Sequence, residues 1–330
     1  MDCIFARGFV LIVFFCSSIS AQEPPFGAKA KPTRLLSNDA GEGPAWHPQR
    51  GLFFSGPRGI TRMSPSGTLQ PFRYPSGGSN GLLFDLDGHL VICEARRRRV
   101  TRTDDQGRTT VLADQYQGKR FNTPNDLTID SKGRVYFSDP RYGDRKDMEI
   151  LDDNNNPIEG VYRIDRPGQV TRIITHEVDR PNGLLITPDD KYLFVADNNN
   201  NQVGGARQLF RFNLTSNGDI VPGSRKLIFN WQDGRGPDGM ALDRQGRLYV
   251  AGGRNKTNQY ESANQFKAGV YVMTQEGQQI GFVAIPRDEV TNCTFGGRDL
   301  KSLFITAGGQ LWRIPTLTAG WSPIRTPTHK

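Results

Sequence analysis

Six oxygen-bearing side chains stand at corresponding places in six similar stretches of the sequence. They are Glu42, Asn80, Asn125, Asn182, Asp238 and Asn292, separated by 38, 45, 57, 56 and 54 residues. Two are carboxylates, four are amides, and none is a histidine or cysteine. If the fold brings them together, this all-oxygen set suits a hard cation, because calcium takes roughly six to eight oxygen ligands. We therefore predict a site for one divalent cation, with calcium favoured and magnesium, manganese or zinc as alternatives.

These residues also have a simpler explanation, because Asn-Gly and Asp-Gly pairs are common in tight turns. That explanation accounts well for Asn80, which Gly81 follows. It accounts poorly for Glu42, since glutamate is not a turn-forming residue. It also does not predict a polar residue at the same place in all six stretches, so the cation site is favoured.

Each of the six residues opens a repeated unit: a turn, a short strand, a polar turn and a second apolar strand. The unit reads PNDLTIDSKGRVYFSDP from Pro124, PNGLLITPDDKYLFVAD from Pro181 and PDGMALDRQGRLYVAGG from Pro237. Further strand-like sequence follows each of the first five units, which makes four strands per unit. Periods of about 40 to 50 residues with four strands are typical of propeller blades. The sequence therefore predicts an all-β, six-bladed β-propeller with four-stranded blades and a core over about 34–314.

The sixth unit lacks its outermost strand, because the strand-like sequence ends at Trp312–Ile314. The segment Thr33–Leu36, before the first unit, can supply this strand and close the ring. A closed ring leaves no long sheet edge exposed. Its inner strands surround a central channel, and the six oxygen-bearing side chains then converge at one face of that channel.

The N-terminus has the pattern of a signal peptide over 1–21. Arg7 precedes the apolar run Val10–Phe15, and cleavage is expected near Ala21. We expect an exported protein, periplasmic or secreted, with a single propeller domain over 22–330. No other segment is long and apolar enough to span a membrane.

The chain has a net charge of +8, spread along the sequence except for the run Arg96–Arg99. An exported protein rarely meets nucleic acid, so we interpret this run as a solvated turn and expect no nucleic-acid partner.

Cys93 and Cys293 lie in strand-like stretches 200 residues apart. They carry no disulfide framework and are expected to be buried thiols. We expect a monomer.

Five segments together resemble the senescence-marker-protein/gluconolactonase (regucalcin-like) family, from about Arg34 to Trp312. They are EGPAW at 42–46, KRFNTPNDL at 119–127, YFSDPRYG at 136–143, RPNGL at 180–184 and GPDGM at 236–240. The resemblance implies a calcium-dependent lactonase or related ester hydrolase. It implies metal ligation by Glu42, Asn182 and Asp238, with Asn125 beside the metal. It also implies that Asp238 donates and accepts the proton and that Arg120 contacts the substrate.

Elementary chemistry is consistent with that activity. Lactone hydrolysis places negative charge on the carbonyl oxygen in the transition state, and a cation at the channel floor can polarise that oxygen and orient a water. Arg120 or the Asn125 amide can donate a further hydrogen bond. Asp238 is then the candidate to handle the proton of the water, although a carboxylate bound to a cation is a weak base and can mainly position the water. The expected substrate is a small lactone, such as that of a sugar acid.

Three other patterns have competing interpretations. Gly77–Gly81 fits the Gly-x-Ser-x-Gly string of serine hydrolases, but a strand-like run follows Ser79 where a helix is required. Asp85–Gly88 begins like a calcium-binding loop but lacks the closing glutamate, so we predict a hairpin turn. The run Asn198–Asn201 can bind a second cation or form a solvated loop, and we favour the loop.

The main functional alternative is a non-catalytic extracytoplasmic propeller that binds protein or glycan, with aromatic or basic residues gathered on one rim.

Overall fold

The computed structural model describes residues 23–325. The predicted signal peptide, 1–21, lies outside the described residues. Short antiparallel strands make up nearly all of the regular structure in 23–325, and Ala95–Arg97 forms one 3-10 turn. No helix in this range is long and apolar enough to cross a membrane.

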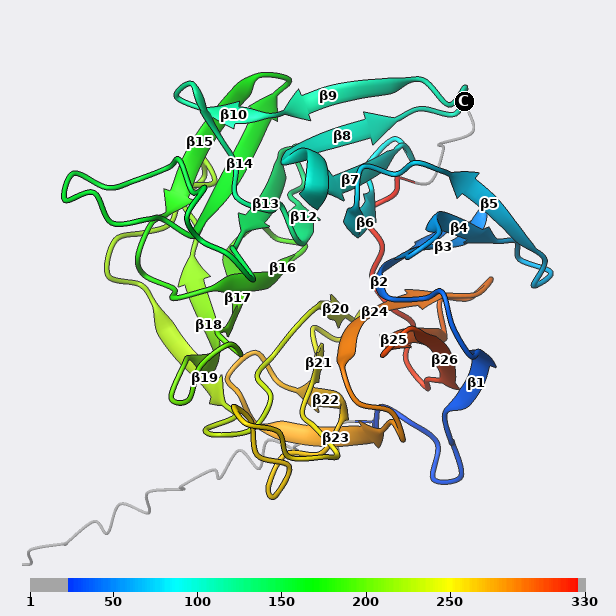
Figure 1. The fold of residues 1–330 in the computed structure, drawn as a ribbon. Coiled ribbons are helices and arrows are strands. Elements are labelled where there is room, and N and C mark those ends of the chain that lie inside the picture. Colours follow the sequence, from blue (N-terminus) through cyan, green and yellow to red (C-terminus); the bar gives the residue numbers. More distant parts are fainter. Residues whose placement is uncertain (1–22, 326–330) are drawn as a thin grey trace, which may run out of the picture.

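Six four-stranded sheets stand around a central channel (Figure 1), which confirms the predicted six-bladed β-propeller. In each sheet the first strand of the repeat is innermost. The strands, from the channel outward, are β2 Glu42–His47, β3 Gly51–Gly56, β4 Gly59–Met63 and β5 Leu69–Arg73 in blade 1; β6 Ser79–Phe84, β7 Leu90–Glu94, β8 Arg99–Thr103 and β9 Thr109–Ala113 in blade 2; β12 Leu127–Ile129, β13 Val135–Asp139, β14 Gly160–Arg166 and β15 Gln169–Ile174 in blade 3; β16 Pro181–Ile186, β17 Tyr192–Asn198, β18 Arg207–Asn213 and β19 Lys226–Asn230 in blade 4; and β20 Met240–Leu242, β21 Leu248–Gly252, β22 Gly269–Met273 and β23 Gln279–Ala284 in blade 5.

Blade 6 is closed by the N-terminal strand, as predicted. It consists of β24 Val290–Gly296, β25 Ser302–Ala307 and β26 Gln310–Pro315, with β1 Thr33–Leu36 as its outermost strand. Thr33 pairs with Arg313 and Arg34 with Trp312. A two-stranded hairpin, β10 Gln115–Tyr116 and β11 Lys119–Arg120, connects blades 2 and 3.

The hydrophobic core lies between neighbouring blades. Between blades 2 and 3, Cys93 packs in one buried cluster with Phe121, Phe137 and Tyr162. The Phe121 and Phe137 rings meet edge to face, with centroids 5.0 Å apart. Cys293 is buried in the corresponding cluster of blades 5 and 6, and both cysteines are free. The prediction of two buried thiols is therefore confirmed.

Aspartates accept backbone N–H groups in the hairpin turns between the first two strands of blades 2, 3 and 5, with Asp130 in blade 3. Asp243 accepts the N–H groups of Gln245 and Arg247 and pairs with the Arg247 guanidinium at 2.5 Å. In blade 2, Asp85 accepts the N–H groups of Asp87 and His89 in the same way, which confirms the predicted hairpin turn. The Asp85, Asp87 and His89 side chains could together approach a metal ion. The hydrogen bonds of the turn already account for this arrangement.

The chain after β26 crosses the face of the ring where the inner strands end. Three backbone hydrogen bonds tie it to the blades: Arg244 N to Ala319 O, Trp321 N to Leu242 O and Arg325 N to Leu86 O. We call residues 316–325 the C-terminal plug. Because the plug spans the strand ends of several blades, it covers this end of the central channel.

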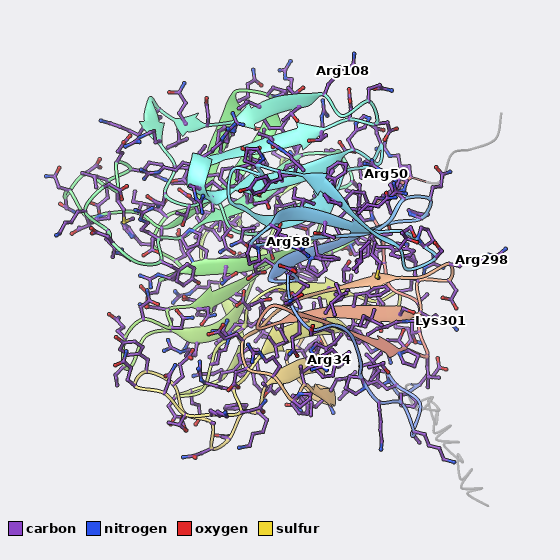
Figure 2. The ribbon with its side chains drawn as sticks, turned by 45° about the vertical axis from the view of Figure 1, so that its right-hand side comes forward. Arg34, Arg50, Arg58, Arg108, Arg298 and Lys301 are labelled. Carbon is purple, nitrogen blue, oxygen red and sulfur yellow. The ribbon has the colours of Figure 1, made fainter. Side chains whose placement is uncertain are left out.

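Basic side chains are distributed over several blades. Six of them, labelled in Figure 2, spread over the height of the molecule. The run Arg96–Arg99 matches the predicted solvated turn only in its first half, since Arg96 and Arg97 are exposed. Arg98 is buried in a left-handed conformation, and its guanidinium donates to Phe121 O and contacts Asp147. Arg99 pairs with the buried Glu94 at 2.8 Å. These arginines satisfy interior acceptors, which sequence charge alone did not indicate.

Candidate functional site

The inner strands begin at the channel face opposite the C-terminal plug, and a cluster of acids and amides gathers there. Glu42, Asn182 and Asp238 come from blades 1, 4 and 5. Burial raises the pKa of Glu42 well above its usual value, and the negative charges of Asp238 and Asp126 raise it further. Burial also raises the pKa of Asp238 to about 6. The structure therefore brings these predicted residues together, and their shared environment is short of positive charge.

The backbone of Glu42 lies one residue earlier in its inner strand than the sequence alignment with Asn182 indicates. It lies opposite Ser55, whereas in blade 4 Pro181 lies opposite the corresponding Asp197. Glu42 therefore matches Pro181 in the ladder, one residue before Asn182. Gly43, which follows it, has a positive φ of 53°, a conformation that favours glycine. The longer side chain of glutamate suits a backbone position one residue farther out.

The sixth position of the ring is Thr291, where the sequence alignment placed Asn292. Between blades 5 and 6, the N–H of Gly239 donates to Thr291 O. Between blades 2 and 3, the N–H of Gly81 donates to Asn125 O in the same way. Thr291 thus corresponds to Asn125, and its hydroxyl donates to Gly41 O at 2.7 Å. Matching asparagine to asparagine was wrong here, because the hydrogen bonds between blades set the register, and they place Thr291 where residue type alone placed Asn292.

Asn292 lies one layer deeper in the channel, level with Asp126. Its amide approaches Asp126 Oδ2 at 3.4 Å, and the Leu127 N–H donates to Asp126 Oδ1 at 2.9 Å. Burial raises the pKa of Asp126 to about 7, and the charge of Asp238 adds to the rise. Asp126 is a buried acid beneath the ring, and the sequence analysis did not single it out.

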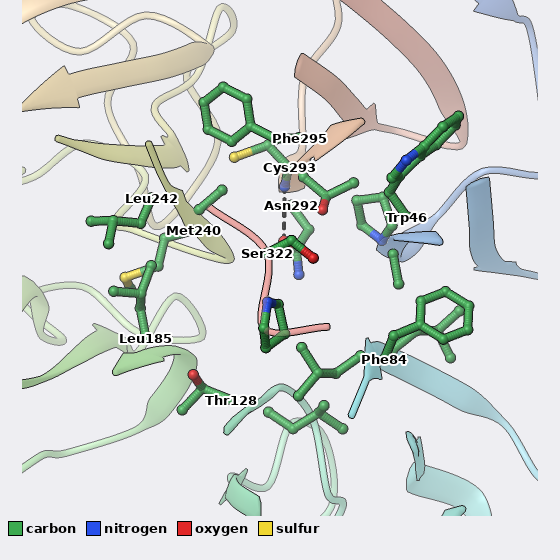
Figure 3. A pocket seen from close by; sticks show the side chains of 18 of the residues that line it. Trp46, Phe84, Thr128, Leu185, Met240, Leu242, Asn292, Cys293, Phe295 and Ser322 are labelled. Atoms are coloured by element: carbon green, nitrogen blue, oxygen red, sulfur yellow. Dashed lines mark hydrogen bonds between the residues drawn. The ribbon is translucent and has the colours of Figure 1, made fainter. Parts of the chain in front are cut away.

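Below this layer the channel becomes apolar. Figure 3 shows the cavity there, of about 110 Å³, with Asn292 and Cys293 from β24 and with Ser322 from the C-terminal plug. Trp46, Phe84 and Leu242, at the ends of their inner strands, contribute to its walls. The polar groups therefore occupy the ring end of the channel, and the plug covers the other end, so a polar ligand would reach them from the ring face.

Two side chains outside the ring hold its members in place. The Arg235 guanidinium donates to Asp238 Oδ2 at 2.7 Å and lowers the pKa that burial raises. The Tyr142 hydroxyl accepts the Asn182 Nδ2–H at 3.0 Å and donates to Asn198 O at 3.1 Å. Because Nδ2 is engaged by Tyr142, the oxygen of the Asn182 amide remains available as a ligand. Neither contact was predicted.

The two predicted substrate-binding residues lie in different surroundings. Asn125 precedes β12 and is mostly buried at the ring. Within residues 23–325 its side chain makes no hydrogen bond, so its amide is available to a ligand. Arg120 lies on β11, where its side chain is 61% exposed and pairs with Glu149. The structure thus places Asn125 with the cluster and Arg120 on an outer hairpin.

Two competing patterns are resolved by the structure. Ser79 opens β6, and its hydroxyl donates to Ser76, so the strand-to-helix elbow of serine hydrolases does not form there. Asn198 and Asn199 are buried, so the predicted solvated loop at Asn198–Asn201 is wrong for its first half. Asn198 ends β17 beside the ring.

The fold and this cluster together define a six-bladed propeller with one polar site at the open end of its channel. The chain belongs to the SMP-30/Gluconolactonase/LRE-like family, whose model matches residues 40–309. The family resemblance seen in the sequence is thereby confirmed.

Individual relatives are similar over most of their length. A gluconolactonase of Zymomonas mobilis is 31% identical over 322 residues, covering 88% of this chain and 82% of the relative. A pentonolactonase of Haloferax volcanii is 26% identical, covering 84% and 85%. The solved structure of a gluconolactonase from Xanthomonas campestris has 29% identity and a TM-score of 0.71, covering 90% of this chain and 96% of that one.

Proposed function

We propose that this protein hydrolyses lactones, as an enzyme acting on a carboxylic ester bond, and that it does so with one bound divalent cation, calcium being favoured. One observation carries the proposal: Glu42, Asn182 and Asp238 converge at the open end of the channel in a chain that belongs to this family. The similar gluconolactonases and pentonolactonase support the reaction class. The non-catalytic alternative is favoured by no comparable observation.

The residues present suit a cation. The pKa values of Glu42, Asp126 and Asp238 are all raised, chiefly by burial. Arg235 is the arginine that pairs directly with this cluster in the described residues. A dication would offset the remaining excess of negative charge, and oxygen ligands from carboxylates and amides suit calcium. Glu42, Asn182 and Asp238 would hold it, with Asn125 beside it.

A bound dication would polarise the lactone carbonyl and stabilise the negative charge that develops on its oxygen. The side chains of this chain account for the other requirements. Asn125 has a free amide that can donate to the substrate. Arg235 donates to Oδ2 of Asp238, and the Asn182 amide also hydrogen-bonds this carboxylate. Asp238 is the candidate to accept the proton of the attacking water. A bound cation would lower the pKa of Asp238, so this carboxylate would be ionised but a weak base, and it can mainly position the water.

A contact between Arg120 and the substrate stays a prediction. The Arg120 guanidinium pairs with Glu149 on the exposed hairpin, so it would have to leave that partner to donate to a substrate. Arg120→Ala tests this contact, since a contacting arginine raises KM when it is removed. An unchanged KM would remove Arg120 from the site.

The substrate proposal is a sugar-acid lactone. Gluconolactone is the first candidate because of the similar gluconolactonases, and pentonolactones follow from the Haloferax relative. The test is hydrolysis of a panel of five- and six-membered lactones by the purified protein at saturating calcium. Hydrolysis of none of them would contradict the proposed function and favour the binding module.

We further propose that the protein acts as an exported monomer. The proposal depends on the signal-peptide pattern over 1–21 and on the closed ring, which leaves no long open sheet edge. N-terminal sequencing of protein from the periplasm or medium should begin near residue 22. An intact N-terminus in the cell interior would contradict export, and a dimer in light scattering would contradict the monomer.

A further inference from the structure

A buried group of charged side chains lies beside Asp238. Arg235 donates to Asp238, and its Nη1 lies 4.0 Å from Oε1 of Glu261. Arg207 Nε is 4.0 Å from the same oxygen, and Arg254 pairs with the other Glu261 oxygen at 2.6 Å. Arg235, Arg207 and Glu261 are each less than a tenth exposed. Glu261 therefore places a buried negative charge beside the arginine that contacts the ring.

The backbone before Asp238 is built to bring Arg235 inward. A Cβ atom on Gly236 would lie 3.0 Å from the Arg207 Cα and 3.1 Å from Asn198 Oδ1, so this segment packs directly against blade 4. The loop between β21 and β22 then supplies Glu261 from the other side. Arg235 is thus enclosed between two blades, and its position is fixed by neighbours that do not belong to the ring.

A second buried pair in the same blade shows what a purely structural arginine looks like. Asp243 accepts two backbone N–H groups as well as the Arg247 guanidinium, so that pair closes a hairpin turn. Asp238 accepts no backbone N–H within residues 23–325. Arg235 Nε, Arg207 Nε and Glu261 Oε1 are buried without a hydrogen-bond partner in that range. Arg247 Nη2 is also without a partner among the described residues, so the difference between the two pairs is that the Arg235 pair closes no turn.

We propose that Arg235 is a positioning residue of the lactonase site, holding Asp238 with one oxygen on the guanidinium and the other toward the channel. In addition, its positive charge sets how strongly the ring attracts a cation. The inference rests on the proposed function for its effect on turnover. Its effect on cation binding stands apart from that function.

A purely structural role for Arg235 and the proposed electrostatic role make opposite predictions for calcium binding by Arg235→Met. A side chain that only supported the fold would weaken calcium binding when removed, because the ring would lose its shape. A positive charge close to the ring repels the cation, so its removal should tighten calcium binding about tenfold. The turnover number should nevertheless fall roughly 10- to 100-fold, because Asp238 is no longer held.

Arg235→Lys separates charge from geometry and covers the case in which Arg235→Met does not fold. Lysine keeps the charge but lacks the planar fork that can reach Asp238 and Glu261 together. Calcium affinity should stay within about threefold of wild type, while the turnover number falls about tenfold at an unchanged KM. The matched control is Arg247→Lys in the turn pair, which should lower thermal stability and change neither calcium affinity nor the turnover number.

The experiment measures calcium affinity by isothermal titration calorimetry and lactone turnover at saturating calcium, for the wild type and the three variants. Weaker or unchanged calcium binding in folded Arg235→Met would overturn the proposal. So would a wild-type turnover number in Arg235→Lys. If the wild type hydrolyses no lactone but Arg235→Met binds calcium more tightly, the proposed function fails while the electrostatic role of Arg235 stands.

Discussion

Replacing Asp126 by asparagine should stabilise the metal-free protein at high pH. Burial raises the pKa of this carboxyl from 3.8 to about 7, so the folded state holds its proton more tightly than the unfolded state does. The ionised carboxyl therefore destabilises the fold. The penalty begins as pH rises through 3.8 and is complete above about 7. A pKa difference of about three units corresponds to about 4 kcal/mol.

The assay is thermal or urea unfolding of metal-free wild type and Asp126→Asn at pH 8 and pH 4. The variant should be more stable at pH 8, by up to about 4 kcal/mol, and little different at pH 4, where the folded wild type carries a neutral carboxyl. Excess calcium should make the wild type more stable than the variant at pH 8, because the Asp126 carboxylate then faces a cation instead of other carboxylates.

Asp243→Asn is the control for this prediction. Asp243 is also buried, but it is paired with Arg247, so its replacement leaves an uncompensated guanidinium and should cost about 3–5 kcal/mol. A metal-free Asp126→Asn protein that is less stable than wild type at pH 8 would refute the electrostatic reasoning for the channel.

Three further substitutions test individual side chains. Asp238→Asn should fold and still bind some calcium, yet lose at least about two orders of magnitude in lactone turnover at saturating calcium; retention of most of the rate would rule out a catalytic role. Tyr142→Phe should weaken calcium binding about tenfold or more in a calorimetric titration, because Asn182 loses the hydroxyl that orients its amide; wild-type affinity would show that the orientation does not depend on it. Ser79→Ala should leave hydrolysis nearly intact, and a fall of several hundredfold with fold and metal retained would revive the serine-hydrolase interpretation.

The blades could be predicted because their signals are local. Each unit combines a Gly- or Asp-rich turn with alternating apolar residues, and both depend on neighbours a few positions away. The closing strand Thr33–Leu36 followed from counting strands in the sixth unit. The gathering of Glu42, Asn182 and Asp238 followed from the symmetry of a closed ring.

The details that failed depend on contacts between blades. The hydrogen bond from Gly239 N places Thr291 at the sixth ring position, and Asn292 lies below it beside Asp126, although residue type alone matched Asn292 to the other ring asparagines. The run Asn198–Asn201 has the composition of a solvated loop, yet Asn198 is enclosed by blade 5 at Gly236. Composition does not reveal which segment will pack against another.

The positioning residues Arg235 and Tyr142 were missed for the same reason. Tyr142 follows β13 of blade 3 but contacts Asn182 of blade 4, and the sequence gives no register between blades. Arg235 did leave a signal, since a charged residue three positions before Asp238 in a Gly-Pro segment is close to the ring by chain connectivity alone. Arg120 looked equally promising in its motif, but the β10–β11 hairpin carries it outward.

The most direct test of the central claim is the cation dependence of lactone hydrolysis by the intact protein. The protein is stripped with a chelator, and turnover of gluconolactone and pentonolactones is measured before and after calcium is restored, with magnesium, manganese and zinc in parallel. The account predicts that turnover is lost on stripping and returns with about one bound ion per chain, as elemental analysis would count it. Full activity in stripped protein shown to contain no metal would contradict it.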